Sequence, residues 1–231
     1  MRRLVAALAL ATALAPGMAL AQAAPAPNVH PSANWAGYVA GNAYYSAVSA
    51  LIQTPTPAAA SPPGVVASWV GIGNAPNDVI QAGVEQIIST NGVITHAWYE
   101  LLPQPSRNVV LDVQPSAWVL IDIRELEFNL WQITLVNGPN VFQRQVQYAS
   151  SHSTAEWIVE RPELGGGRLL PLATVTGANF ANMSAVANGV TAIPAQLYPQ
   201  AWGIASALSG NIRVAPSPLG PDGASFGVTT A

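Results

Sequence analysis

The chain has 231 residues, with 8 basic and 11 acidic side chains, 3 histidines and no cysteine. Only 8% of the residues are charged and 50% are apolar, whereas about 25% are charged in an average soluble domain. This composition excludes a disordered polyelectrolyte, which combines low hydrophobicity with high net charge. It also argues against a nucleic-acid partner, because phosphate binding needs a basic patch and the basic residues here are scattered arginines.

Residues 1–21 have the pattern of a secretory signal peptide. Two arginines follow Met1, residues 4–14 are apolar, and Ala19-Leu20-Ala21 has the small-x-small pattern of a cleavage site. The alternative is an N-terminal anchor, but the apolar run is shorter than the ~18 residues of a membrane helix. We therefore predict a secreted (extracellular or periplasmic) protein that does not contact a membrane after cleavage. Residues 22–33 are expected to be a short Ala/Pro-rich spacer.

From Asn34 to the end, the chain predicts a single all-β domain, 34–231. Short β-type runs alternate with turn residues at a spacing typical of an antiparallel sandwich or barrel. The Ala-rich stretch 178–210 could hold either a helical turn or a loop. The predicted strands are 34–40, 65–72, 79–88, 93–102, 109–113, 117–124, 127–136, 141–148, 155–160, 169–176 and 211–215.

Acidic residues are scarce, so their positions on the predicted strands are informative. Side chains alternate between the faces of a strand, which places Glu156 and Glu160 on one face of 155–160. The same rule puts Trp98 with Glu100, and Gln81 with Glu85. This pattern suggests a groove lined with aromatic and carboxyl groups, although a solvated sheet face would produce it too.

Other chemical signals are weak. The three histidines show no metal-ligand spacing, so we expect neither a metal nor a cofactor. Residues 223–227 match the G-x-S-x-G nucleophile motif, but an acid and a histidine should follow that serine. Only four residues follow Gly227, and the chain has no α/β pattern, so we interpret the match as chance.

Five segments together resemble the eqolisin (glutamic peptidase) family, in the family's order and at similar spacing. The resemblance covers about residues 34–175 and fits a cysteine-free, bacterial-type member. The segments are Asn34-Trp35-Ala36-Gly37-Tyr38, Trp69-Val70-Gly71-Ile72, Ile80-Gln81-Ala82-Gly83, Ala97-Trp98-Tyr99-Glu100 and Ala155-Glu156-Trp157-Ile158-Val159-Glu160.

The resemblance implies a fold, an activity and site residues. The family fold is a concanavalin-like β-sandwich of two bent antiparallel sheets with its active site on the concave face. Gln81 and Glu160 match the catalytic pair. Trp69 and Trp98 match aromatic residues of the substrate cleft, and Glu85 and Glu100 match supporting acids. Gly73 stands where the family commonly has an acid. A polypeptide substrate and a monomeric secreted acid endopeptidase are the resulting expectations.

A glutamine and a glutamate can together hydrolyse a peptide bond. Glu160 would take a proton from water and return one to the leaving amine, while the Gln81 amide donates to the oxyanion. We expect hydrogen-bond donors to lower the pKa of Glu160 and activity to peak near pH 3–4. The alternatives are a non-catalytic carbohydrate- or peptide-binding sandwich, in which only Trp69 and Trp98 would matter, and a glycosidase with paired carboxylates.

Overall fold

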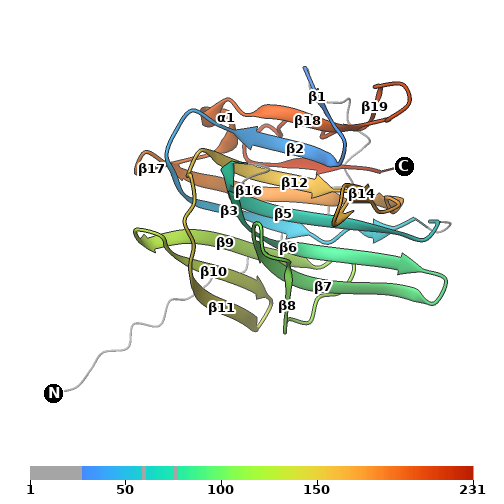
Figure 1. Ribbon diagram of the computed structural model, residues 1–231, viewed down its shortest axis with the longest axis horizontal. Helices are drawn as coiled ribbons and strands as arrows, with labels where there is room; N and C mark the ends of the chain where they lie inside the picture. The colour runs from blue at the N-terminus through green and yellow to red at the C-terminus, as the bar shows by residue number, and fades with distance from the viewer. Residues whose placement is uncertain (1–27, 59–60, 75–77, 231) are drawn as a thin grey trace.

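The computed structural model describes residues 28–58, 61–74 and 78–230. They form two large β-sheets that pack against each other (Figure 1), and the predicted all-β sandwich is confirmed. The predicted signal peptide and the first half of the predicted spacer, residues 22–27, lie outside the described residues. Within them, no helix is long and apolar enough to cross a membrane.

The larger sheet has nine strands in the order β1-β18-β2-β12-β5-β6-β7-β8, with β19 paired to β18. Every pairing is antiparallel except that of β1 with β18. The bounds are β1 His30–Ser32, β2 Trp35–Ala40, β5 Gly64–Asn74, β6 Asp78–Ser89, β7 Gly92–Leu101, β8 Arg107–Val109, β12 Thr154–Glu160, β18 Gln200–Ala205 and β19 Ile212–Val214.

The smaller sheet has seven strands in the order β11-β10-β9-β3-β16-β17, with β20 paired to β16. Its strands are β3 Tyr45–Gln53, β9 Trp118–Glu127, β10 Leu130–Asn137, β11 Asn140–Gln147, β16 Ala178–Ala187, β17 Val190–Ala192 and β20 Phe226–Val228. The remaining elements are the pairs β4 Thr56–Pro57 with β15 Val175–Thr176 and β13 Glu163–Leu164 with β14 Arg168–Leu169, and the one-turn helix α1 Pro194–Leu197.

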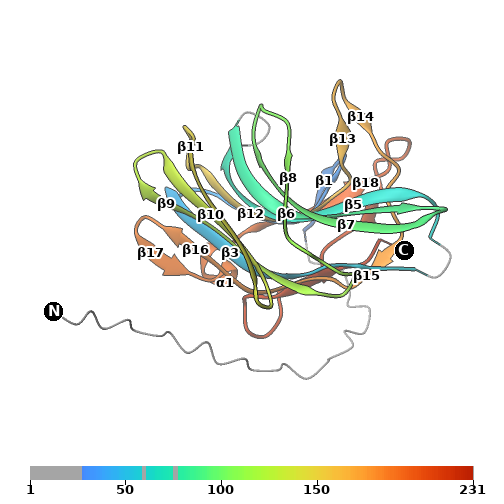
Figure 2. The same ribbon diagram turned by 90° about the horizontal axis from the view of Figure 1, so that it is seen from below.

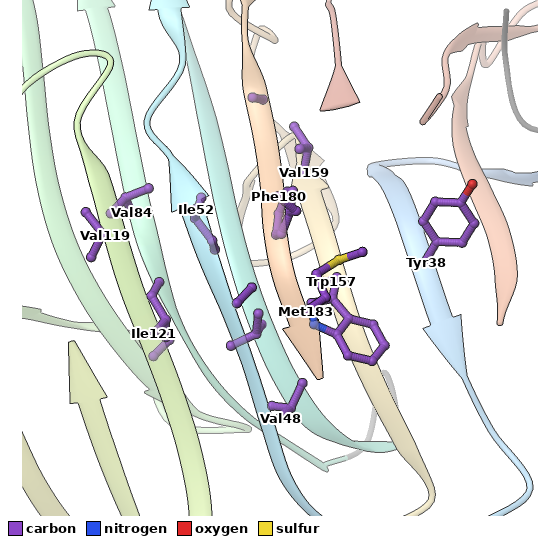
Figure 3. Close-up of a cluster of buried hydrophobic side chains, with 14 of the residues drawn as sticks. Tyr38, Val48, Ile52, Val84, Val119, Ile121, Trp157, Val159, Phe180 and Met183 are labelled. Carbon is purple, nitrogen blue, oxygen red and sulfur yellow. The ribbon is translucent and has the colours of Figure 1, made fainter. Parts of the chain in front are cut away.

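The main hydrophobic core lies between the two sheets. Trp157 and Val159 of β12 point into it, as do Ile52 of β3 and Ile121 of β9, and all four are fully buried (Figure 3). Because side chains alternate along β12, Glu156, Ile158 and Glu160 must lie on the other face of this sheet.

That outer face carries a second, smaller apolar cluster. It consists of Ala67, Trp69, Val79, Trp98 and Ile158, packed against the partly buried Trp35, Val39 and Leu102. Figure 2 shows β5, β6 and β7 strongly curved, with β8 and the β13–β14 hairpin projecting on the side away from β3 and β16. The sheet thus buries side chains on both of its faces.

A buried histidine links the segment before β12 to the smaller sheet. The His152 ring stacks between Tyr44, with ring centroids 4.1 Å apart, and Trp131, at 5.1 Å. Its Nδ1 lies 2.8 Å from the carbonyl oxygen of Tyr45, and its Nε2 lies 3.5 Å from Glu125 Oε1. The segment that leads into β12 is therefore fixed to the smaller sheet by aromatic stacking on the His152 ring and by contacts of both its ring nitrogens.

The predicted strands agree best with the structure where the run of apolar and alternating residues is strongest. The predictions 65–72, 79–88, 93–102 and 155–160 correspond to β5, β6, β7 and β12. The predicted strand 109–113 is wrong in position, because β8 ends at Val109. No strand was predicted at 45–53, where the structure has β3. The open stretch 178–210 contains β16, β17 and β18 as well as the one helical turn.

Candidate active site

Strand register places the candidate residues in three rows on the outer face of the larger sheet. Residues paired across neighbouring strands share a face, so the register defines each row across β12, β5, β6 and β7. The first row is Glu160, Ala67, Glu85, His96; the second is Ile158, Trp69, Gly83, Trp98; the third is Glu156, Gly71, Gln81, Glu100. All six predicted site residues therefore lie on one face.

Glu160 ends β12, and its carboxylate accepts a hydrogen bond on each oxygen. The indole Nε1 of Trp69 donates to Oε2 at 2.7 Å, and the Asn34 side-chain amide donates to Oε1 at 3.0 Å. The ring of Trp35 packs edge-on against Trp69, with centroids 5.2 Å apart. Although Glu160 is partly exposed, its carboxyl group is surrounded by these side chains.

The expected depression of the Glu160 pKa is wrong. Burial raises the pKa of Glu160 to about 7, and the nearby charge of Glu100 adds to this rise. The hydrogen bonds from Trp69, Trp35 and Asn34 act in the opposite direction but are outweighed, because a carboxylate loses its hydration when protein surrounds it. Glu160 therefore keeps its proton in acid.

Gln81 is joined to Glu100, its neighbour in the third row. The Gln81 Nε2 donates to Glu100 Oε2 at 2.6 Å, while the Gln81 Oε1 is buried and has no hydrogen-bond partner. Burial raises the pKa of Glu100, and the hydrogen bonds from Gln81 and the backbone of Ser106 oppose this rise. Glu100 thus holds the amide of Gln81 in place.

Trp69 lies between Gln81 and Glu160, which make no direct hydrogen bond. Its ring extends from Glu160 towards Gly71, where a Cβ atom would come within 3.0 Å of the Trp69 Cζ3. At Gly83, a Cβ would meet the Trp69 Cβ at 2.6 Å and the Ser68 carbonyl oxygen at 2.4 Å. These two glycines therefore leave the space that the indole occupies.

The other two predicted site residues have different surroundings. Glu85 pairs with His96, whose Nε2 lies 3.0 Å from Glu85 Oε2. Trp98 is 7% exposed, and its Nε1 is buried without a hydrogen-bond partner. An unpaired buried donor is costly, and a bound peptide carbonyl would satisfy it.

Glu156 is a further buried carboxyl group on this face. The Thr154 hydroxyl lies 2.5 Å from the Gly73 carbonyl oxygen and 2.7 Å from Glu156 Oε1. A hydroxyl has one hydrogen and a carbonyl oxygen only accepts, so both contacts are satisfied when Glu156 is protonated and donates to Thr154. Burial raises the pKa of Glu156 to about 7, which agrees with this state.

Two contacts of the site were not predicted from the sequence. Asn34 belongs to a segment that carries the family resemblance, but its bond to Glu160 spans 126 residues. The pairing of His96 with Glu85 follows from the β6–β7 register alone. Among the described residues, no group of three or more His, Cys, Asp or Glu side chains is placed to hold a metal ion.

The model of the peptidase A4 family matches residues 33–199, which is more than half of the chain and includes the face described above. The chain belongs to the peptidase A4 family. Its membership makes it a hydrolase of the glutamic endopeptidase class, and the resemblance to the eqolisins is confirmed. None of the curated proteins compared with it matches.

Solved structures of peptidases share the fold of this A4 family member. Scytalido-glutamic peptidase with a peptide-based transition-state analog has a TM-score of 0.72 at 17% identity, covering 86% of this chain and 98% of that one. SCP-B, an eqolisin in complex with the tripeptide Ala-Ile-His, has a TM-score of 0.68 at 16% identity, covering 86% of this chain and 98% of that one. Aspergilloglutamic peptidase from Aspergillus niger has a TM-score of 0.62 at 21% identity, covering 73% and 99%.

Proposed function

We propose that this peptidase is a secreted endopeptidase that hydrolyses polypeptides in acid with Glu160 and Gln81. The observation that carries the proposal is the register of β12, β5, β6 and β7, which places Glu160 and Gln81 on the same face of the sheet. On that face Trp69 donates to Glu160 and Gln81 donates to Glu100, so each proposed catalytic side chain is held by a neighbour.

Glu160 begins the reaction as a neutral carboxyl group, since its pKa is raised to about 7. A neutral carboxyl group has one O–H donor and one accepting oxygen. The accepting oxygen takes a proton from the attacking water while the O–H gives its proton to the nitrogen of the scissile bond. The tetrahedral intermediate keeps its oxyanion, and the C–N bond then breaks to release the free amine. The carboxyl group is thus unchanged after one cycle, as general acid–base catalysis requires.

Gln81 stabilises the oxyanion of the tetrahedral intermediate. Its Nε2 has two hydrogens, of which one is used by Glu100, so the second is free to bind the oxyanion. Because an amide does not ionise, this donor persists at any pH at which the protein is folded. Removal of one such donor typically costs about 100-fold to 1,000-fold in kcat.

An extended polypeptide is the substrate that this face suits best. The Gln81 Oε1 needs a donor and the Trp98 Nε1 needs an acceptor, and a peptide backbone offers both. Trp98, which is 7% exposed, and the partly buried Trp35 supply apolar surface, and the fully buried Trp69 packs behind them. Peptide-based ligands in structures of two peptidases with this fold support the same substrate class.

The test is digestion of an unfolded, fluorescently labelled protein from pH 2 to pH 8. Wild type, Glu160→Gln and Gln81→Ala are compared with Glu127→Gln, a control on the exposed part of β9. We expect cleavage in acid by wild type and Glu127→Gln, loss in Glu160→Gln and a loss of at least 100-fold in Gln81→Ala. Full activity of a folded Glu160→Gln would contradict the proposal.

If the folded wild type cleaves nothing at any pH, the proposed function is wrong. Retention of the chain on a polysaccharide or peptide column would then favour a binding sandwich, and release of sugars would favour a glycosidase. Sequencing of the secreted product's N-terminus tests cleavage near residue 21, and gel filtration tests the proposed monomer.

A further inference from the structure

A histidine–glutamate pair lies beside the proposed catalytic residues. His96 and Glu85 share the row of Glu160, separated from it only by Ala67. The His96 Nε2 lies 3.0 Å from Glu85 Oε2, and 22% of each side chain is exposed. The pair therefore lies on the outer face of the larger sheet and is in contact with solvent.

One side of the His96 ring is free to bind. Within the described part of the chain, its Nε2 pairs with Glu85 and no hydrogen bond joins its Nδ1 to another residue. Histidine is a cation in acid, when both ring nitrogens are donors. The Nδ1–H can then donate to an acceptor that approaches along this face.

His96 is also the only potential cation in the three rows across β12, β5, β6 and β7. The other histidine of this face, His30, lies on the distant edge strand β1. The three remaining carboxyl groups in the rows, Glu100, Glu156 and Glu160, all have raised pKa values. In acid they tend to be neutral and so do not cancel an attraction for anions.

The distance from Glu160 to His96 corresponds to a few residues of substrate. Three steps between neighbouring strands span about 14 Å at ~4.8 Å each, and an extended peptide advances ~3.3 Å per residue. His96 thus lies about four residues from the bond that Glu160 would cleave. Beyond it, Ile87 and the exposed Ile94 form the next cross-strand pair and offer an apolar contact to a long side chain.

We propose that His96 forms a specificity subsite that binds an acidic side chain of the polypeptide substrate, preferably glutamate, about four residues from the cleaved bond. The Nδ1–H donates to the substrate carboxylate, while Glu85 fixes the ring through Nε2. Ile94 packs against the aliphatic part of the glutamate. This inference rests on the proposed peptidase function.

The test uses peptides of ten residues that share one cleavage site and differ at a single position. That position, four residues before or after the cleaved bond, holds Glu, Gln or Lys. At pH 5 a glutamate side chain, with an ordinary pKa of about 4.3, is mostly ionised. We expect wild type to show about tenfold higher kcat/KM for the Glu peptide than for the Lys peptide in one of the two sets, as for one charge-assisted hydrogen bond.

Two variants should change this ratio in opposite directions. His96→Gln keeps a donor for Glu85 but removes the cation and Nδ1–H, so the ratio should fall to about 1. Glu85→Gln removes the negative charge beside the imidazole, so the ratio should rise. Glu127→Gln, on the other sheet, should keep the wild-type ratio.

The outcomes separate this subsite from the proposed function. A wild type that cleaves both sets with equal kcat/KM for Glu and Lys would overturn the subsite alone. So would a His96→Gln variant that loses activity equally on all peptides, because that loss would indicate a structural role. Absence of cleavage of every peptide and protein substrate would remove the proposed function and the subsite with it.

Discussion

The indole of Trp69 donates a hydrogen bond to the Glu160 carboxylate at 2.7 Å, from the strand next to β12. A donor of this kind stabilises the ionised carboxylate. Trp69, which is fully buried, therefore limits how far burial raises the pKa of Glu160.

Trp69→Phe should move the alkaline limb of the pH profile upwards. Without the indole donor the pKa of Glu160 rises further above about 7, so the neutral, active form persists to higher pH. A charged-group hydrogen bond of about 1.5 kcal/mol corresponds to about one pH unit. The measurement is kcat/KM against pH for the variant and wild type.

The wild-type profile itself tests the protonation state. If neutral Glu160 starts the reaction, activity falls as pH increases through about 7. Activity that instead rises through pH 7 would show that the ionised carboxylate is the starting form.

Gly71→Ala should reduce activity by at least tenfold with a modest loss of stability. The added methyl group would meet the Val79 Cγ1 at 2.9 Å and the Trp69 Cζ3 at 3.0 Å, and so displace the indole from Glu160. Gly41→Ala is the matched control, because no atom lies within 4 Å of its Cβ position. Equal kcat/KM for both variants would show that the indole position is not critical.

Stability should decrease between about pH 4.5 and about pH 7, and Glu156 should be one cause. Burial raises its pKa to about 7, above the unfolded value of about 4.3. In this interval the unfolded chain releases the proton while the folded chain keeps it, so increasing pH favours unfolding. The resulting decrease in the free energy of unfolding is of the order of 3 kcal/mol. It is fully developed above pH 7 and absent below about pH 4.

Urea unfolding of wild type and Glu156→Gln at pH 4 and pH 7.5 measures this contribution. The glutamine can still donate to Thr154 but does not titrate, so the variant should lose less stability at pH 7.5. An identical pH dependence of the two proteins would exclude Glu156 as a source.

His152→Ala should destabilise the fold by about 3 kcal/mol, a typical cost of removing a large buried side chain with its hydrogen bonds. His152 is 3% exposed and lies outside the catalytic face, so the folded variant should keep its kcat/KM at low temperature. Thermal unfolding and activity at 15 °C measure the two effects, with Tyr198→Ala, which is 89% exposed, as the control. A loss of activity without a loss of stability would contradict this assignment.

The sequence predicted the fold class and the strand β12 but not every strand of the sandwich. Strong alternation in β12 was sufficient to place Glu156 and Glu160 together, and the register confirms it. In β3 and β16 the inward positions are partly small residues such as Ala50 and Ala185, so the apolar pattern is weak. A bulge between Ala181 and Ser184 also shifts the alternation in β16.

The electrostatics of the site could not be read from the sequence. Glu160 does receive hydrogen-bond donors, as expected, and the structure identifies two of them as Trp69 and Asn34. The sign of the pKa shift depends on how completely protein replaces water around the carboxyl group, and this follows from packing of segments that are far apart in the chain.

The division of the larger sheet into a core face and a catalytic face has a consequence for protein engineering. Along β12, Ala155, Trp157 and Val159 support the contact between the sheets, and Glu156, Ile158 and Glu160 lie on the face of the proposed active site. A substitution scan along this strand should therefore alternate, from one residue to the next, between variants that fail to accumulate and folded variants that fail to cleave. Thermal resistance and substrate preference can then be selected in separate libraries drawn from the same seven positions.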